Sequence, residues 1–148
     1  MAHWLFKSEP GVYSIDDLRR DRRTMWEGVR NYQARNLMRE ARQGDGVLFY
    51  HSQSKEVAGL AEVVKEAYAD PTQFDKRSKY FDPKSDPAEP RWSLVDIEFV
   101  RAFEEPIPLA DLKQIPALAG MALLERGSRL SIQPVASGEW RAIVKRGR

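Results

Sequence analysis

Short apolar runs recur along the chain, and polar residues, glycine or proline separate them. Runs of this kind, rich in aromatic and β-branched residues, predict strands. The predicted strands span residues 3–7, 47–51, 57–67, 92–103 and 129–135. The fourth strand is expected to turn four apolar side chains to one side, namely Val95, Ile97, Phe99 and Phe103. Pro106 and Pro108 are expected to end it, because proline cannot donate to a strand ladder.

A spacing of three and four residues between apolar positions predicts the main helix, which begins near Tyr32. Its apolar positions are Ala34, Leu37, Met38 and Ala41. Gly44 is expected to end it, with Arg42 in the last turn. Ser14, followed three positions later by an acidic residue, resembles a capping box and predicts a short helix over residues 14–20. Further helices are predicted at residues 109–115, at residues 117–126 with Gly127 as the stop, and around Trp140, Ile143 and Val144.

Residues 70–91 differ in composition from the rest of the chain. They contain four prolines and many charged residues but few apolar ones, and Tyr80 and Phe81 are expected to be exposed. A long loop inside a compact domain is typically functional or mobile. The order of strands and helices predicts one α+β domain over residues 1–148, built around a mixed or antiparallel sheet.

The composition excludes several kinds of functional site. The net charge of +2 permits nucleic-acid binding without arguing for it. The chain has no cysteine, which excludes disulfides, thiolate nucleophiles and cysteine-ligated zinc. Its two histidines fit no metal motif, and its glycines form no phosphate-binding signature. Without a signal peptide or a long apolar run, we expect a cytoplasmic monomer that needs no metal, cofactor or membrane.

The stretch MWEGVRNYQARNLMREARQGD, residues 25–45, combines a tryptophan with four arginines, two asparagines and two glutamines. Trp26, Arg30 and Asn31 precede the predicted helix, where side chains can project into a neighbouring cavity. An aromatic platform beside amide and guanidinium donors is what recognition of a nucleobase requires. Trp26 can equally be an ordinary core tryptophan. The arginine stripe of the helix, at positions 35, 39 and 42, is either a solvated face or a track for phosphates.

Lys7, Ser8 and Glu9 are consecutive at the end of the first predicted strand. A lysine beside a hydroxyl and a carboxylate can activate a nucleophile. Consecutive strand residues point to opposite faces, so the three converge only if the strand ends there, as Pro10 and Gly11 suggest. An ordinary polar strand end is the simpler interpretation of these three residues alone.

At this point the chain resembles a known family, the EVE domain. The resemblance covers nearly the whole chain and rests on motifs that occur in the family's order: WLFKSEP, WEGVRNYQARNLMR, FYHS, YFDPKS, PRW, VDIEF and RLSIQPV. It implies a PUA-like fold, with a curved, barrel-like sheet flanked by short helices, and kinship with YTH domains, which hold a methylated adenine between aromatic rings. It also implies a bacterial single-domain protein that reads a modified base in DNA or RNA, with modified cytosine favoured and no established catalytic activity.

The resemblance to YTH domains assigns roles to individual positions. Lys7 and Ser8 match the lysine–serine of the YTH motif, and Trp26 stands where that family has a cage tryptophan. Glu9 stands near an asparagine of YTH domains, and an ionised glutamate only accepts hydrogen bonds, which suits the exocyclic amine of cytosine. The second cage aromatic is left open among Phe81, Trp92 and Phe99.

The resulting prediction is a non-enzymatic protein that binds a modified base. Trp26 stacks on the base, and its edge and substituent are contacted by Lys7, Ser8, Glu9, Arg30, Asn31, Tyr32, Ser52 and Ser131. The phosphate contacts are expected from Arg35, Arg39, Lys79 and Arg129. The alternative is an amidohydrolase acting on a modified cytidine, because related ASCH-type domains use a lysine, a hydroxyl residue and a glutamate. Lys7, Ser8 and Glu9 offer these types in an order that does not match the ASCH pattern.

Overall fold

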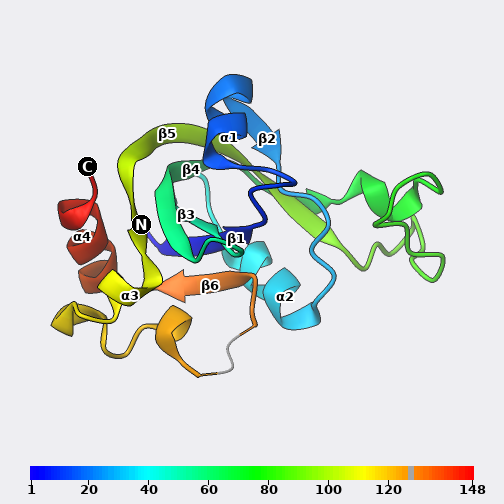
Figure 1. Ribbon diagram of the computed structural model, residues 1–148. Coiled ribbons are helices and arrows are strands. Elements are labelled where there is room, and N and C mark those ends of the chain that lie inside the picture. Colours follow the sequence, from blue (N-terminus) through cyan, green and yellow to red (C-terminus); the bar gives the residue numbers. More distant parts are fainter. Residues whose placement is uncertain (127–128) are drawn as a thin grey trace.

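A computed structural model describes residues 1–126 and 129–148, and a curved six-stranded sheet forms its centre (Figure 1). The strands are β1 (His3–Ser8), β2 (Arg23–Met25), β3 (Gly46–His51), β4 (Glu56–Ala69), β5 (Ser93–Pro108) and β6 (Ile132–Val135). They lie in the order β2-β5-β4-β3-β1-β6, so the sheet does not close into a barrel. β1 and β3 are parallel and the other neighbours antiparallel, which makes the sheet mixed, as predicted.

Four short helices flank the sheet: α1 (Ile15–Asp21), α2 (Tyr32–Glu40), α3 (Leu109–Leu112) and α4 (Ser137–Arg146). Three 3-10 turns complete the elements: η1 (Pro71–Phe74), η2 (Pro116–Leu118) and η3 (Ala122–Leu124). The predicted capping box of α1 is confirmed, because Ser14 and Asp17 each accept a hydrogen bond from the other's backbone N–H. Asn31 caps α2 by accepting from the N–H of Ala34.

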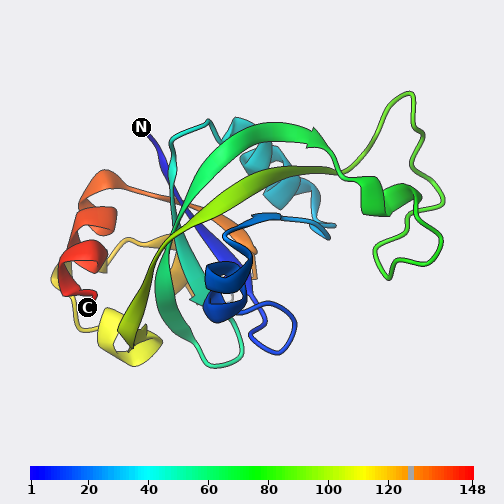
Figure 2. The same cartoon turned by 90° about the horizontal axis from the view of Figure 1, so that it is seen from above.

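The alternation of side chains along the central strands produces two apolar clusters, one on each face of the sheet. Trp4 and Phe6 of β1 join a cluster with α1 and α2, whereas Leu5 joins a second cluster with α3 and α4. Figures 1 and 2 show α4 and α3 at the end of the molecule away from the segment between β4 and β5. The site described below lies beside the first cluster.

Two predictions about β5 are wrong, and a neighbouring strand was not predicted. The strand does not break at Pro106 but continues to Pro108, its last residue, because β2 covers the far edge of β5 only at residues 96–98, and proline is tolerated along an uncovered edge. Phe103 lies in the second cluster and not with Val95 and Ile97, since the register of β5 against β4 shifts between them. The strand β2, which sequence analysis did not predict, is three residues long.

The C-terminal third is more broken than predicted. The helix expected over residues 109–115 ends at Leu112, and residues 117–126 form 3-10 turns instead of a helix. The last strand begins at Ile132, three residues later than expected. The expected stop at Gly127 lies outside the described residues. Within the described ranges, no helix combines the length and apolar character needed to cross a membrane.

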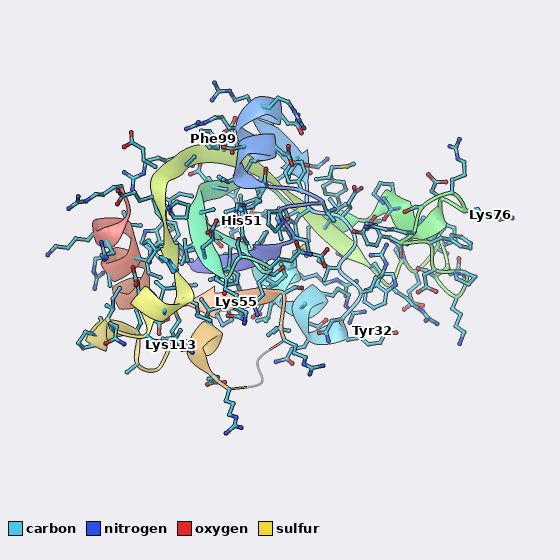
Figure 3. The ribbon with its side chains drawn as sticks, viewed as in Figure 1. Tyr32, His51, Lys55, Lys76, Phe99 and Lys113 are labelled. Carbon is cyan, nitrogen blue, oxygen red and sulfur yellow. The ribbon has the colours of Figure 1, made fainter. Side chains whose placement is uncertain are left out.

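The segment between β4 and β5 extends away from the sheet, as Figure 2 shows, and contains only η1 as regular helix. This confirms the predicted long loop at residues 70–91. Figure 3 places Lys76 at its outer end. The part of the segment that returns toward the sheet brings Tyr80 back to the body of the protein, where it forms one wall of a pocket.

Candidate functional site

A pocket of about 550 Å³ opens where β1 ends, beside the segment that runs from β2 to α2. Its lining comes from five separate parts of the chain: the end of β1, the turn after it, residues 24–30, residues 79–80, and Ser131 before β6. Pairing of β1 with β3 and β6 fixes the end of β1, and the backbone N–H of Lys7 donates to the Ser131 carbonyl at 2.9 Å. The volume is in the range of small-ligand sites.

Trp26 is at once a core residue and part of the pocket lining. Its side chain is 8% exposed and packs against Phe6 and Phe49, with ring centroids 5.4 and 5.5 Å away. Its backbone N–H donates to the Val95 carbonyl at 2.9 Å, which anchors the residue to β5. Trp26 is therefore a core tryptophan and also a residue of the pocket lining.

Tyr80 lines the pocket together with the aromatic residues Trp26 and Tyr13, and sequence analysis did not select it as a cage residue. Its ring lies directly against Gly28, so close that a Cβ at Gly28 would come within 2.5 Å of the ring. Gly28 has a φ of +86°, which glycine adopts freely and other residues rarely do. The signal for Tyr80 in the sequence was an aromatic residue in a polar loop. The expectation that it is exposed is wrong, because Tyr80 is half-buried against Gly28 and Arg30.

The three side chains proposed as the second aromatic lie elsewhere. Trp92 is buried beneath Tyr32, and its indole N–H donates to Asp82 at 2.7 Å. Phe99 packs against the guanidinium groups of α1 and its C-cap, and Figure 3 shows it well separated from Tyr32. Phe81 is not among the pocket residues. The structure therefore points to Tyr80 for this place.

Replacing Gly28 by alanine is expected to cost about 1–3 kcal/mol of stability, because the backbone is strained and the new Cβ displaces Tyr80. Urea unfolding followed by tryptophan fluorescence measures the change. Gly44→Ala is the matched control, since Gly44 has a φ of +95° but open space where a Cβ would stand. Equal losses in the two variants would mean that the contact with Tyr80 contributes nothing.

Arg30 attaches the long loop to the pocket. Its five guanidinium N–H groups all donate within the protein, to the carbonyls of Val29 and Tyr80, the hydroxyl of Thr72 and the carboxylate of Asp70, at 2.8–3.1 Å. Arg30 also belongs to the pocket lining, and its predicted contact with a base edge stays a prediction. Arg30 holds Tyr80 in place, because two of its donors converge on the Tyr80 carbonyl.

Asp70 is the buried partner of Arg30, and its side chain is fully inaccessible to solvent. Burial alone would raise the pKa of this carboxyl, but hydrogen bonds from Thr72, the Gly28 backbone and Arg30 together hold the pKa below its ordinary value. The carboxylate is therefore ionised at neutral pH. Asp70 thus connects three elements of the site: Gly28, Arg30 and the start of the loop.

Alternating cations and aromatic rings extend this attachment to the surface. The Arg35 guanidinium lies 4.8 Å from the Tyr32 ring centroid, and Tyr32 stacks on Trp92 at 4.9 Å. The Arg30 guanidinium lies 5.5 Å from the Trp92 ring centroid and 5.6 Å from the Tyr80 ring centroid. Contacts of this kind stabilise a fixed geometry. The loop is thereby bound to the start of α2, and Figure 3 shows Tyr32 there.

The polar end of β1 meets the pocket as predicted, with Lys7, Ser8 and Glu9 all in the lining. Burial lowers the pKa of the Lys7 amine. The Ser8 hydroxyl donates to the Tyr13 carbonyl, and the Glu9 carbonyl accepts the N–H groups of Val12 and Tyr13. The turn after β1 is therefore closed by its own hydrogen bonds, which lets three consecutive residues reach one site.

Glu27 is a second carboxylate of the lining; it precedes the predicted helix together with Trp26 and Arg30, but the sequence prediction gave it no contact with the base. Burial, followed by the negative charge of Asp70, raises its pKa, and Arg30 and Lys79 oppose that shift. Its position directly after Trp26 was the available signal. With Glu9 and Glu27, the pocket offers two acceptors for hydrogen-bond donors of a ligand.

Other predicted site residues divide between the pocket and structural positions. Lys79 and Ser131 line the pocket. Asn31 caps α2, Tyr32 packs on Trp92, and the Ser52 hydroxyl donates to the Ser8 carbonyl at 3.3 Å. Arg129 is exposed and outside the lining. Contacts of these four with a ligand remain predictions.

Arg35 and Arg39 were predicted to contact phosphates, but both bind the loop. Each donates to the Arg91 carbonyl, at 3.0 and 3.3 Å, and Arg39 also donates to the Ser93 hydroxyl at 2.9 Å. Arg42 follows the end of α2 and lies 3.4 Å from Glu66. The described residues contain no group of three or more histidine, aspartate or glutamate side chains that could hold a metal ion.

Comparison with known proteins agrees with the fold. The EVE domain matches residues 2–146. Human thymocyte nuclear protein 1 is 46% identical over 160 residues, covering 94% of this chain and 71% of that protein. A crystal structure of a Pseudomonas syringae protein, 46% identical, superposes with a TM-score of 0.93 over 97% of this chain and 98% of the other.

Two further structures bear on function and fold. Human THYN1 protein in complex with 5-methylcytosine-containing DNA is 44% identical, with a TM-score of 0.90 over 98% of this chain and 96% of the other. A Zymomonas mobilis ASCH protein is 12% identical with a TM-score of 0.59, a likeness that concerns the fold alone. On the match over residues 2–146 and the identity to its relatives, the chain belongs to the EVE domain family.

Proposed function

We propose that this protein binds a modified nucleobase of the cytosine type, 5-methylcytosine in DNA before others, in the pocket between Trp26 and Tyr80. The observation that carries the proposal is the joint placement of these two aromatic residues with Lys7, Ser8 and Glu9 around one pocket of about 550 Å³. A base in such a pocket would meet aromatic surface and polar groups that can distinguish its edge. The complex of human THYN1 with 5-methylcytosine-containing DNA supports the choice of ligand.

The polar lining favours cytosine over other bases. The carboxylates of Glu9 and Glu27 accept hydrogen bonds, and the exocyclic amine of cytosine donates them. Lys7 and Ser8 offer donors for the acceptor atoms of the same base edge. Val29, a buried apolar residue of the lining, provides contact for a methyl group.

Binding of oligonucleotides that differ in one central base tests the proposal. The set contains cytosine, 5-methylcytosine, 5-hydroxymethylcytosine, adenine and N6-methyladenine, in single- and double-stranded DNA and in RNA. The wild-type protein is expected to bind 5-methylcytosine at least about tenfold more tightly than cytosine, and Tyr80→Ala is expected to remove most of that difference, since one stacking contact accounts for such a factor.

Val100→Ala is the control, because Val100 is 54% exposed and lies outside the pocket lining. It should leave the preference for 5-methylcytosine unchanged. Equal binding of all five bases by the wild-type protein would overturn the proposal. Incubation with N4-acetylcytidine adds a check on the amidohydrolase alternative: release of acetate would support catalysis, for which the Ser8 hydroxyl is poorly placed, since it donates to the Tyr13 carbonyl.

A further inference from the structure

Two exposed apolar side chains stand at the rim of the pocket. Val12 is 55% exposed and Met25 is 42% exposed, and both belong to the pocket lining. The remaining large apolar side chains of the lining are Trp26 and Val29, which are 8% and 6% exposed. Two accessible apolar side chains therefore stand at the pocket that we propose to hold the base, where a bound partner would cover them.

These two side chains come from different segments that the fold fixes independently. Met25 is the last residue of β2, pairs with Asp96 of β5, and directly precedes Trp26. Figure 1 shows β2 at the edge of the sheet beside α1. Val12 lies in the turn between β1 and α1, where its N–H donates to the Glu9 carbonyl at 2.9 Å. Both side chains thus project from backbone that is already ordered.

Cations flank this apolar rim. Arg22 and Arg23 immediately precede Thr24 and Met25 in the chain, and the side chain of Arg23 is 52% exposed although it lies 3.5 Å from Asp96. The exposed Lys79 belongs to the pocket lining. Exposed arginine and lysine beside a base pocket complement a phosphate backbone. Their charge favours nucleic acid as the partner that covers the rim.

A base that leaves a duplex to enter a pocket leaves a gap in the stack. Proteins that unstack DNA commonly fill such gaps with an apolar side chain such as methionine, leucine or isoleucine. We infer that Met25, assisted by Val12 of the same pocket lining, enters the base stack of a DNA duplex at the position vacated by the base in the pocket. This inference rests on the proposed function and extends it, because a single strand has no gap to fill and would not need the rim.

The test compares duplex and single-stranded DNA carrying one 5-methylcytosine, with wild-type protein and the double variant Met25→Ala/Val12→Ala. The double variant is expected to bind the duplex about tenfold more weakly and the single strand equally well, because only the duplex must be held open. Met25→Leu should restore most of the duplex affinity, since leucine also fills the gap. Val100→Ala is the matched control: Val100 is 54% exposed on β5 and lies outside the pocket lining.

A second measurement follows the gap itself. 2-Aminopurine placed next to the 5-methylcytosine in the duplex should brighten when wild-type protein binds, and brighten less with saturating double variant. The role of the rim is overturned if the double variant loses affinity for both forms of DNA, or for neither, while wild-type protein still prefers 5-methylcytosine on the single strand. Absence of that preference in wild-type protein on both forms would overturn the proposed function, and the rim proposal with it.

Discussion

Replacing Arg30 by methionine is expected to lower the free energy of unfolding by about 3–5 kcal/mol, because it leaves the Asp70 carboxylate buried without its cation. Asp70 is wholly inaccessible, and its carboxylate lies 3.0 Å from the Arg30 guanidinium. The same change removes both donors to the Tyr80 carbonyl. Denaturant unfolding of wild type and variant at neutral pH measures the loss directly.

Arg35→Met provides the control for this prediction. Arg35 also reaches the loop, donating to the Arg91 carbonyl, but it has no buried carboxylate as partner, so a loss below about 1 kcal/mol is expected. The pair Arg30→Met and Asp70→Asn, measured singly and together, gives the coupling between the two groups. Independent, additive effects would show that the ion pair does not hold the loop.

Local patterns in the sequence were sufficient to predict the two helices and the strand next to the pocket. The capping box at Ser14 and the apolar face of α2 depend on residues within one or two turns, so the chain itself displays them. The strand β1 and the polar residues that follow it were visible for the same reason. The resemblance to the EVE and YTH families, and not these local patterns, placed Trp26 with Lys7, Ser8 and Glu9 in one site, and all four line the pocket.

Contacts over long sequence separations were not visible in this way. Arg30 and Tyr80 are fifty residues apart, and nothing near either of them indicates that one binds the other's carbonyl. Arg30 was therefore assigned to the base, although the protein itself uses all its donors. The three candidates for the second aromatic lie outside the pocket lining for the same reason, because the loop's path decides whether Tyr80, Phe81 or Trp92 faces the pocket.

The prolines of β5 illustrate a third limit, which concerns sheet edges. Whether Pro106 ends a strand depends on whether a neighbour needs its missing N–H, and that neighbour, β2, is only three residues long. A strand so short carries too little alternation to be recognised. The residues that β2 exposes, above all Met25, became meaningful only through their position at the pocket rim.

Replacing Trp26 by alanine is expected to cost about 3–5 kcal/mol of stability, because it empties the space between Phe6 and Phe49 in the first cluster. Loss of ligand binding in this variant would therefore not show that Trp26 touches the base. Trp26→Phe keeps an aromatic side chain in the cluster and should cost less stability. Thermal unfolding and titration with 5-methylcytosine DNA must be measured on the same preparations.

The comparison of the two variants separates the roles of this side chain. If Trp26 contributes stacking surface, Trp26→Phe should remain folded and still lose part of its preference for 5-methylcytosine, because phenylalanine presents a smaller ring to the pocket. A folded Trp26→Phe protein with undiminished preference would leave Tyr80 as the side chain that stacks on the base. Trp26 would then act on the ligand only by supporting the floor of the pocket through its contacts with Phe6 and Phe49.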